Sequence, residues 1–82
     1  MFNLLYTDQA LKQLGKLDKS LQERIIRTLE RIRIRPSSHV KKLVSSPYFR
    51  LRVGDYRVIL DIKRDELIIL VIEVGHRKNI YQ

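Results

Sequence analysis

The clearest structural signal lies in residues 49–60, which read FRLRVGDYRVIL. Gly54 and Asp55 make the two-residue loop of a β-hairpin that has glycine at its first turn position. Such a loop fixes the register of the two strands, so we expect Val53 to pair with Tyr56. Because side chains alternate between the two faces of a strand, one face of this hairpin is predicted to be core. That face carries Phe49, Leu51, Val53, Tyr56, Val58 and Leu60.

The other face of the predicted hairpin concentrates positive charge. It carries Tyr48, Arg50, Arg52 and Arg57. The register sets Arg52 directly opposite Arg57, with Arg50 on the diagonal, and like charges in such positions destabilise a sheet. Guanidinium groups that converge on one patch are well suited to bind a phosphate. The pattern therefore favours a phosphate-binding site, and the alternative is a basic face that is simply solvated.

The whole chain predicts a single α+β domain over residues 1–82, with the element order β-α-α-β-β-β. Thr7 is the expected N-cap of the first helix, and Asp18 or Ser20 is the expected N-cap of the second, which runs to about Ile34. The first helix covers residues 8–15, and the expected strands are residues 2–6, 48–53, 56–62 and 67–74.

The apolar positions predict how these elements pack. Residues 67–72 are apolar at every position, which is typical of a strand that is buried on both faces and flanked on both edges. We therefore expect an antiparallel four-stranded sheet with the first strand beside the last and residues 48–53 at the opposite, basic edge. A helical hairpin covers one face of this sheet, and its predicted buried stripe consists of Leu11, Leu14, Leu21, Ile25, Leu29 and Ile32.

Composition indicates a polyanion as partner. The chain has 82 residues and a net charge of +8, and the segment from Arg31 to Gly54 holds seven basic residues and no acidic one. Charge concentrated in this way is typical of a phosphate-binding surface. There is no cysteine, and His39 and His76, the only histidines, lack a second ligand at metal-binding spacing, so no metal or other cofactor is expected. Without a membrane-spanning run or a signal peptide, the expected location is cytoplasmic.

The end of the chain adds a second group of polar residues. Residues 74–77 read Val-Gly-His-Arg, and Tyr81 is the penultimate residue. Together with residues 48–59, these residues resemble the RelE branch of the RelE/ParE toxin superfamily, and the resemblance extends over essentially the whole chain. The basic alternating strand, the glycine turn, Tyr-Arg-Val-Ile and the terminal Val-Gly-His-Arg with a tyrosine beyond it form a fairly specific combination.

The resemblance implies a toxin of a type II toxin-antitoxin system that enters the ribosomal A site and cuts messenger RNA. The ribose 2′-hydroxyl would attack the adjacent phosphate and leave a 2′,3′-cyclic phosphate and a 5′-hydroxyl. By this resemblance Arg57 would hold the scissile phosphate, Arg77 would assist it, and Tyr81 would take part in proton transfer. The implied partners are an acidic RelB-like antitoxin and the ribosome with its mRNA, whereas operator DNA would be reached only through the antitoxin complex.

Two positions depart from the family pattern and affect the choice of general base. Family members commonly carry lysine where this chain has Arg50 and Arg52. Lysine can lose its proton and act as a base, whereas arginine cannot, so these two residues are expected only to bind phosphate. The base is then Tyr81, which the resemblance favours, or His76, because an imidazole titrates near neutral pH.

Further basic residues and two other functions stay open. Lys41 and Lys42, with Arg24, Arg27 and Arg31 on one face of the second helix, could contact RNA backbone or simply form a solvated surface. One alternative function is a ParE-like toxin that inhibits DNA gyrase. Another is a non-enzymatic module that binds nucleic acid as a repressor with its antitoxin. Only the nuclease would create new 5′-hydroxyl RNA ends.

Overall fold

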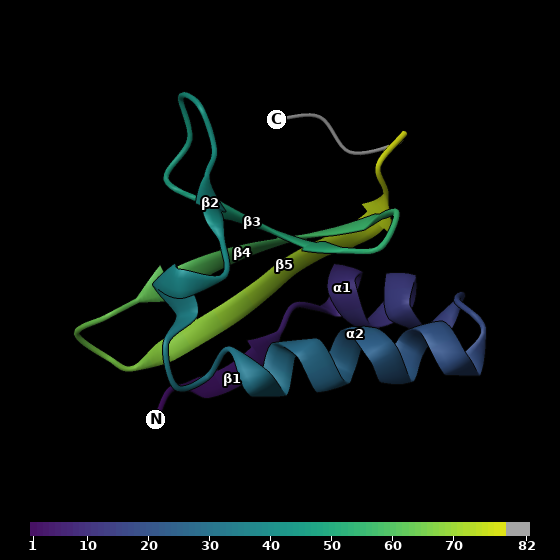
Figure 1. Ribbon diagram of the computed structural model, residues 1–82, viewed down its shortest axis with the longest axis horizontal. Coiled ribbons are helices and arrows are strands. Elements are labelled where there is room, and N and C mark those ends of the chain that lie inside the picture. The colour runs from purple at the N-terminus through teal and green to yellow at the C-terminus, as the bar shows by residue number, and fades with distance from the viewer. Residues whose placement is uncertain (79–82) are drawn as a thin grey trace.

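Two helices cover one face of a β-sheet in the computed structural model, which describes residues 1–78 (Figure 1). Within these residues the sheet has five strands in the order β1-β5-β4-β3-β2. The predicted α+β class and element order are confirmed, with one short strand added. The elements are β1 (Asn3–Tyr6), α1 (Asp8–Gly15), α2 (Lys19–Arg31), the 3₁₀ turn η1 (Pro36–Ser38), β2 (Lys41–Lys42), β3 (Phe49–Val53), β4 (Tyr56–Lys63) and β5 (Ile68–His76).

The β3–β4 hairpin has the register predicted from its sequence. The observed pairs are Val53 with Tyr56, Arg52 with Arg57, Leu51 with Val58, Arg50 with Ile59 and Phe49 with Leu60. Gly54 has a φ of 60°, in the left-handed region that glycine enters without strain. The core face is also as predicted, because its members either are buried or pack against the buried core: Phe49, Leu51, Val53, Tyr56, Val58 and Leu60.

Both helices begin at residues that were predicted as caps. The Thr7 side chain accepts a hydrogen bond from the Ala10 N–H at 3.1 Å. Of the two candidates for α2, Asp18 is the cap, and its carboxylate accepts from the Leu21 N–H at 2.9 Å. Ser20 instead donates to that carboxylate at 3.4 Å. These bonds satisfy N–H groups that the first turn of a helix leaves without an intrahelical acceptor.

The second helix is shorter than predicted, because it ends at Arg31 and not at about Ile34. The residues after α2 instead bond to Phe2, which directly precedes β1. The Phe2 N–H donates to the Arg33 carbonyl at 2.9 Å, and the Arg33 Nε–H donates to the Phe2 carbonyl at 2.7 Å. This reciprocal pair ties the end of the helical hairpin to the start of the sheet, a long-range contact that helix periodicity does not reveal.

The helical stripe is confirmed except at one position. Leu14, Ile25, Leu29 and Ile32 are buried, and Leu21 packs against them. Leu11, however, is 53% exposed, and Ala10 is fully buried instead. The prediction for Leu11 was therefore wrong: the small residue of α1 faces the sheet, where the helix approaches closely.

The sheet differs from the predicted one at both of its edges. β1 lies beside β5 as predicted, but the two strands run parallel, so the sheet is not antiparallel throughout. At the other edge, Lys41 and Lys42 form β2 and pair with Arg50 and Phe49 of β3. β3 is therefore an edge strand only from Leu51 onward. A strand of two residues is too short to show an alternating pattern, which is why no strand was predicted at residues 41–42.

The apolar strand β5 is buried on one face only. It is flanked by β1 and β4, as predicted. Ile69 and Val71 face the helices and are fully buried, whereas Ile68 and Leu70 face the other side and are only partly buried. The prediction of burial on both faces was wrong because both helices lie on the same side of the sheet (Figure 1).

A β-bulge at Ile72 interrupts β5 beside the first helix. The Thr7 hydroxyl donates to the Ile72 carbonyl at 2.9 Å. Two residues further on, the Val74 N–H donates to the Gln13 side-chain oxygen at 2.6 Å. Beyond the bulge, Val74 faces the helices and Glu73 faces the opposite side.

Candidate nucleic-acid interface

The sheet face that points away from the helices, here called the open face, carries the predicted arginines. Arg52 and Arg57 are paired across the hairpin, and Arg50 is diagonal to Arg57. Arg52 is exposed, while Arg50 and Arg57 are half-buried. On the other side of Arg57 the paired residue is Gly75 of β5, which has no side chain to occupy the space beside the guanidinium group. The open face therefore brings Arg50, Arg52 and Arg57 together.

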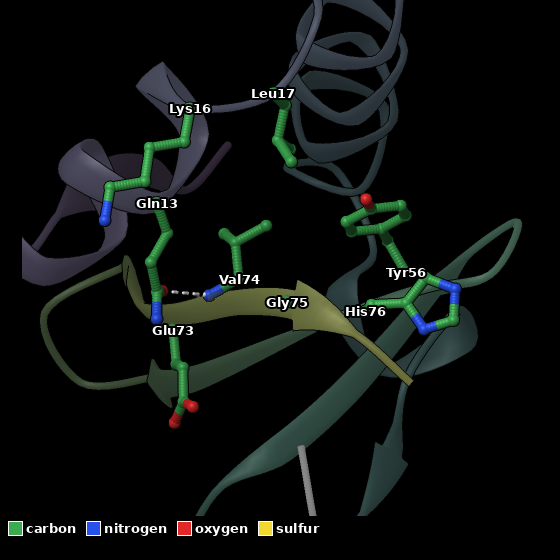
Figure 2. Close-up of a pocket in the computed structure, with 8 residues that line it drawn as sticks. All are labelled: Gln13, Lys16, Leu17, Tyr56, Glu73, Val74, Gly75 and His76. Carbon is green, nitrogen blue, oxygen red and sulfur yellow. Dashed lines mark hydrogen bonds between the residues drawn. The ribbon is translucent and has the colours of Figure 1, made fainter. Parts of the chain in front are cut away.

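Two open-face residues near the arginines were not singled out from the sequence. Ile59 lies in register between Arg50 and Glu73 and is only 5% exposed, so it gives the basic patch an apolar floor. Glu73 is diagonal to Arg57, and its side chain points away from the helices (Figure 2). The signal that could have revealed Glu73 is that it is the one charged residue of β5.

Arg77 follows directly after β5, at the end of the hairpin where the arginines gather. Its N–H donates to the Asp55 carbonyl at 2.9 Å. This bond ties the turn after β5 to the β3–β4 loop and fixes the backbone of Arg77 there. The side chain of Arg77 is exposed.

The two lysines of β2 lie on different faces of the sheet. Lys41 pairs with Arg50, and the alternation of side chains puts it on the open face. Lys42 pairs with Phe49, and its Nζ lies 5.9 Å from the centroid of the Phe49 ring. Lys42 therefore lies on the helix side of the sheet, away from the other predicted phosphate ligands.

His76 is also on the helix side of the sheet, where it lines a pocket of about 290 Å³ (Figure 2). Its ring lies edge-on to Tyr56, with the ring centroids 5.3 Å apart and an angle of 80° between the planes. The Lys78 N–H donates to Nδ1 of His76 at 3.2 Å. Gln13 of α1 and Leu17, in the turn between the two helices, line the same pocket. The sheet thus separates this imidazole from the arginines of the open face.

Three further points concern metal binding, the membrane and Tyr81. Within residues 1–78, no three His, Cys, Asp or Glu side chains lie together in a way that could hold a metal ion. No helix in the described part of the chain is long and apolar enough to cross a membrane. Tyr81, predicted to take part in proton transfer, lies outside the described residues.

Known proteins resemble this chain in both sequence and structure. The family described as the ParE toxin of the type II toxin-antitoxin system parDE matches residues 4–81. An Escherichia coli protein described as a RelE-like toxin is 26% identical, over 94% of this chain and 84% of that protein. In the RelBE2 toxin-antitoxin complex of Mycobacterium tuberculosis, one chain has a TM-score of 0.86 at 22% identity, covering 93% of this chain and 98% of that chain. In the intact E. coli RelBE complex, one chain has a TM-score of 0.81 at 22% identity, covering 93% of this chain and 96% of that chain.

These likenesses define first a fold and then a family. At 22% identity the two solved structures show that the chain has the RelE fold. The family match covers nearly all of the sequence, and the chain therefore belongs to the ParE toxin family of type II toxin-antitoxin systems. It is thus a toxin of the RelE/ParE superfamily.

Proposed function

We propose that this toxin is an endoribonuclease that cuts messenger RNA in the ribosomal A site without a metal ion. The observation that carries the proposal is the group of Arg50, Arg52 and Arg57 on the open face, with Gly75 leaving space beside Arg57. Like charges in cross-strand positions cost stability, and an anion offsets that cost. Guanidinium forks match the oxygen atoms of a phosphodiester, and the positive charge that a metal supplies in other nucleases here comes from arginine.

In the proposed reaction, the ribose 2′-oxygen forms a bond to the adjacent phosphorus while the bond from phosphorus to the 5′-oxygen breaks. The 2′-hydroxyl gives its proton to a base, and the leaving 5′-oxygen receives a proton. Arg57 holds the phosphate oxygens as their negative charge grows, an interaction whose loss typically lowers kcat by about 10²–10³. Arg77 assists at the phosphate or the leaving oxygen. Arg50, Arg52 and Lys41 bind the substrate backbone.

The general base in this proposal is Tyr81. Tyr81 is favoured by its resemblance to the family tyrosine. His76 is disfavoured because its ring packs against Tyr56 on the helix side of the sheet. Glu73 is the other proton acceptor to consider, since its register position is next to that of Arg57.

The experiment that tests this function maps RNA ends. Purified toxin is added to ribosomes that carry a defined mRNA, and the 5′ ends of the fragments are sequenced with and without prior phosphorylation. We expect new ends inside the A-site codon that can be ligated only after phosphorylation, because they carry a 5′-hydroxyl. The Arg57→Ala protein should produce none. An mRNA that stays intact under wild-type toxin would overturn the proposal.

We further propose that the toxin is neutralised by an acidic antitoxin, as the complexes that share its fold contain toxin and antitoxin chains. A net charge of +8 favours a disordered, acidic partner that folds as it binds. Opposite charge accelerates encounter, so the association rate should fall as salt rises, while apolar contacts keep dissociation slow. An association rate that does not respond to ionic strength would show that the arginines have no part in partner recognition.

A second candidate function comes from the family that the sequence matches, which is described as the ParE toxin family. A ParE-like activity would inhibit DNA gyrase and leave RNA intact. A supercoiling assay with purified gyrase, run beside the RNA-end mapping, separates the two functions. A non-enzymatic repressor module would be inactive in both assays and would bind operator DNA only together with its antitoxin.

A further inference from the structure

A basic groove of about 640 Å³ lies between the second helix and the β3–β4 hairpin. One wall is the exposed face of α2 with Arg24, Arg27 and Arg31, and the other wall is Arg52 and Gly54 at the hairpin loop. The groove lies where β3 has no neighbouring strand, since β2 pairs only with Phe49 and Arg50. Side chains from α2 can therefore approach the loop directly.

Two arginines from different elements converge on the backbone of Gly54. The Nη1 atom of Arg24 is 3.1 Å from the position that a Cβ on Gly54 would occupy, so the guanidinium group lies against the glycine. From the strand side, the Nε–H of Arg52 donates to the Gly54 carbonyl at 3.3 Å. Glycine at this position therefore allows the left-handed turn conformation, and its lack of a side chain leaves room for Arg24 of α2.

The groove holds more positive charge than its own acid can balance. Arg24, Arg27, Arg31 and Arg52 meet a single acidic residue, Glu23, among the lining residues. Within the described part of the chain the ion pairs are Arg33 with Glu30 and Lys63 with Asp61, and neither belongs to the groove. Neither of these ion pairs therefore neutralises the four guanidinium groups, of which Arg52 donates one N–H to the Gly54 carbonyl.

We propose that this groove binds the phosphodiester backbone of RNA at phosphates other than the one that is cut. Arg24, Arg27 and Arg31 lie along one side of a helix that rises about 1.5 Å per residue, so their attachment points span about 10 Å. Side chains spaced in this way can contact several successive phosphates of one RNA strand, whereas a single phosphate is too small to reach all three. Arg52 belongs both to the groove and to the open face, so the groove continues the arginine surface around the edge of β3. This inference rests on the proposed function and extends it from the cut phosphate to the backbone around it.

The lining favours RNA over an acidic protein segment. A helix that docks in a groove is held by apolar anchors at its buried positions. Among the described residues, the one apolar side chain that lines this groove is Val53, which is 4% exposed because it belongs to the core. A phosphodiester backbone needs no apolar contact, and bidentate guanidinium groups bind its oxygens well.

The test measures binding of RNA that cannot be cut. The probe is a fluorescent single-stranded RNA of about a dozen nucleotides with 2′-O-methyl groups throughout, and a second arm uses ribosomes that lack mRNA. The groove variant combines Arg24→Gln, Arg27→Gln and Arg31→Gln. A control of equal charge combines Lys12→Gln, Lys19→Gln and Arg64→Gln, three exposed residues outside the groove. Thermal unfolding confirms that both variants fold.

Each phosphate contact to single-stranded nucleic acid contributes about 0.7 to the slope of log affinity against log salt. The groove variant should therefore lose about 2 from this slope and bind at least about tenfold more weakly than the control. Loss toward the oligonucleotide identifies the mRNA strand as the ligand, and loss toward ribosomes alone identifies ribosomal RNA. A companion variant with lysine at the same three positions should keep the slope and lose part of the affinity.

Two results would overturn the inference. Equal losses in the groove variant and the control would mean that the groove acts only through net charge. Loss of binding to a poly-glutamate peptide with unchanged RNA binding would assign the groove to an acidic protein partner. Because the RNA probe cannot be cut, the measured RNA affinity does not depend on the proposed nuclease activity. If the toxin made no 5′-hydroxyl ends but still bound RNA through this groove, the proposed function would be wrong and the inference about the groove would hold.

Discussion

Arg52 and Arg57 stand directly opposite each other across the β3–β4 hairpin, so the sheet places two positive charges in one cross-strand pair. Arg50 adds a third on the diagonal. Like charges in such a pair destabilise a sheet by up to about 1 kcal/mol. We therefore expect the repulsion within the Arg52–Arg57 pair to oppose folding.

Removing the charge of Arg52 should stabilise the folded toxin. Arg52→Gln should raise the free energy of unfolding by about 0.2–1 kcal/mol relative to Arg52→Lys, which keeps the charge. Urea unfolding at low ionic strength measures the difference, which should shrink as salt screens the pair. Equal stability of the two variants at low salt would mean that the arginines avoid each other by pointing apart.

Arg57→Ala and Arg77→Ala should each abolish growth arrest in cells that lack the antitoxin. Both side chains are proposed to act at the phosphate, and neither is in the buried core, so the circular dichroism spectrum should stay unchanged. Arg64→Ala, an exposed residue in the β4–β5 turn, is the control and should remain toxic. Full toxicity of either variant would remove that residue from the proposed site.

Arg50→Ala and Arg52→Ala should act on substrate binding more than on chemistry. We expect them to raise KM more than they lower kcat, whereas Arg57→Ala should lower kcat strongly. Steady-state cleavage on programmed ribosomes gives both parameters. If all three variants lost kcat to the same extent, it would be wrong to assign Arg50 and Arg52 to substrate binding and Arg57 to the transition state.

The choice of general base can be decided by three conservative changes. Tyr81→Phe should lower the single-turnover cleavage rate by about 10²–10⁴. His76→Gln should keep most of that rate, because the imidazole lies on the helix side of the sheet. Glu73→Gln should also keep it. A strong loss in the Glu73 variant with little loss in the Tyr81 variant would transfer the role to the carboxylate.

Tyr6 should make the fold sensitive to alkaline pH. Burial, and secondly the nearby Glu30 carboxylate, raise the pKa of the Tyr6 hydroxyl above its usual 10.0. The folded protein therefore keeps this proton at a pH where the unfolded chain releases it. The stability that Tyr6 contributes is complete below pH 10.0 and declines as the pH rises toward the folded pKa. Urea midpoints measured across this range should fall less for Tyr6→Phe than for wild type, and Tyr48→Phe should behave as wild type.

The sequence was most informative where structure is local. The Gly54–Asp55 loop alone fixes the pairing of β3 with β4 and the face of each arginine, and Thr7 marks the start of α1 through its own hydrogen bond. The direction of β1 was not predictable in this way, because alternating side chains are the same in parallel and antiparallel strands. The two-residue strand β2 gives no periodic signal at all.

The site was predicted only in part because it depends on contacts between elements. Open-face placement of Arg50, Arg52 and Arg57 follows from the hairpin alone. The meeting of Arg24 with the loop at Gly54 depends on how α2 lies across the sheet, and no pattern within either segment contains that information.

The bulge at Ile72 determines which side chains of β5 share the open face with the arginines. In a regular strand of the same sequence, side chains beyond this residue would exchange faces, so His76 would join the arginines while Glu73 would turn its charge into the core. Burial of an unpaired carboxylate is costly, which makes the straight strand a poor alternative. Two side chains of the first helical segment, Thr7 and Gln13, hold the bulged form by their bonds to β5. Substitutions at Thr7 or Gln13, on the helix side of the sheet, could therefore change which side chains lie beside the arginines on the open face.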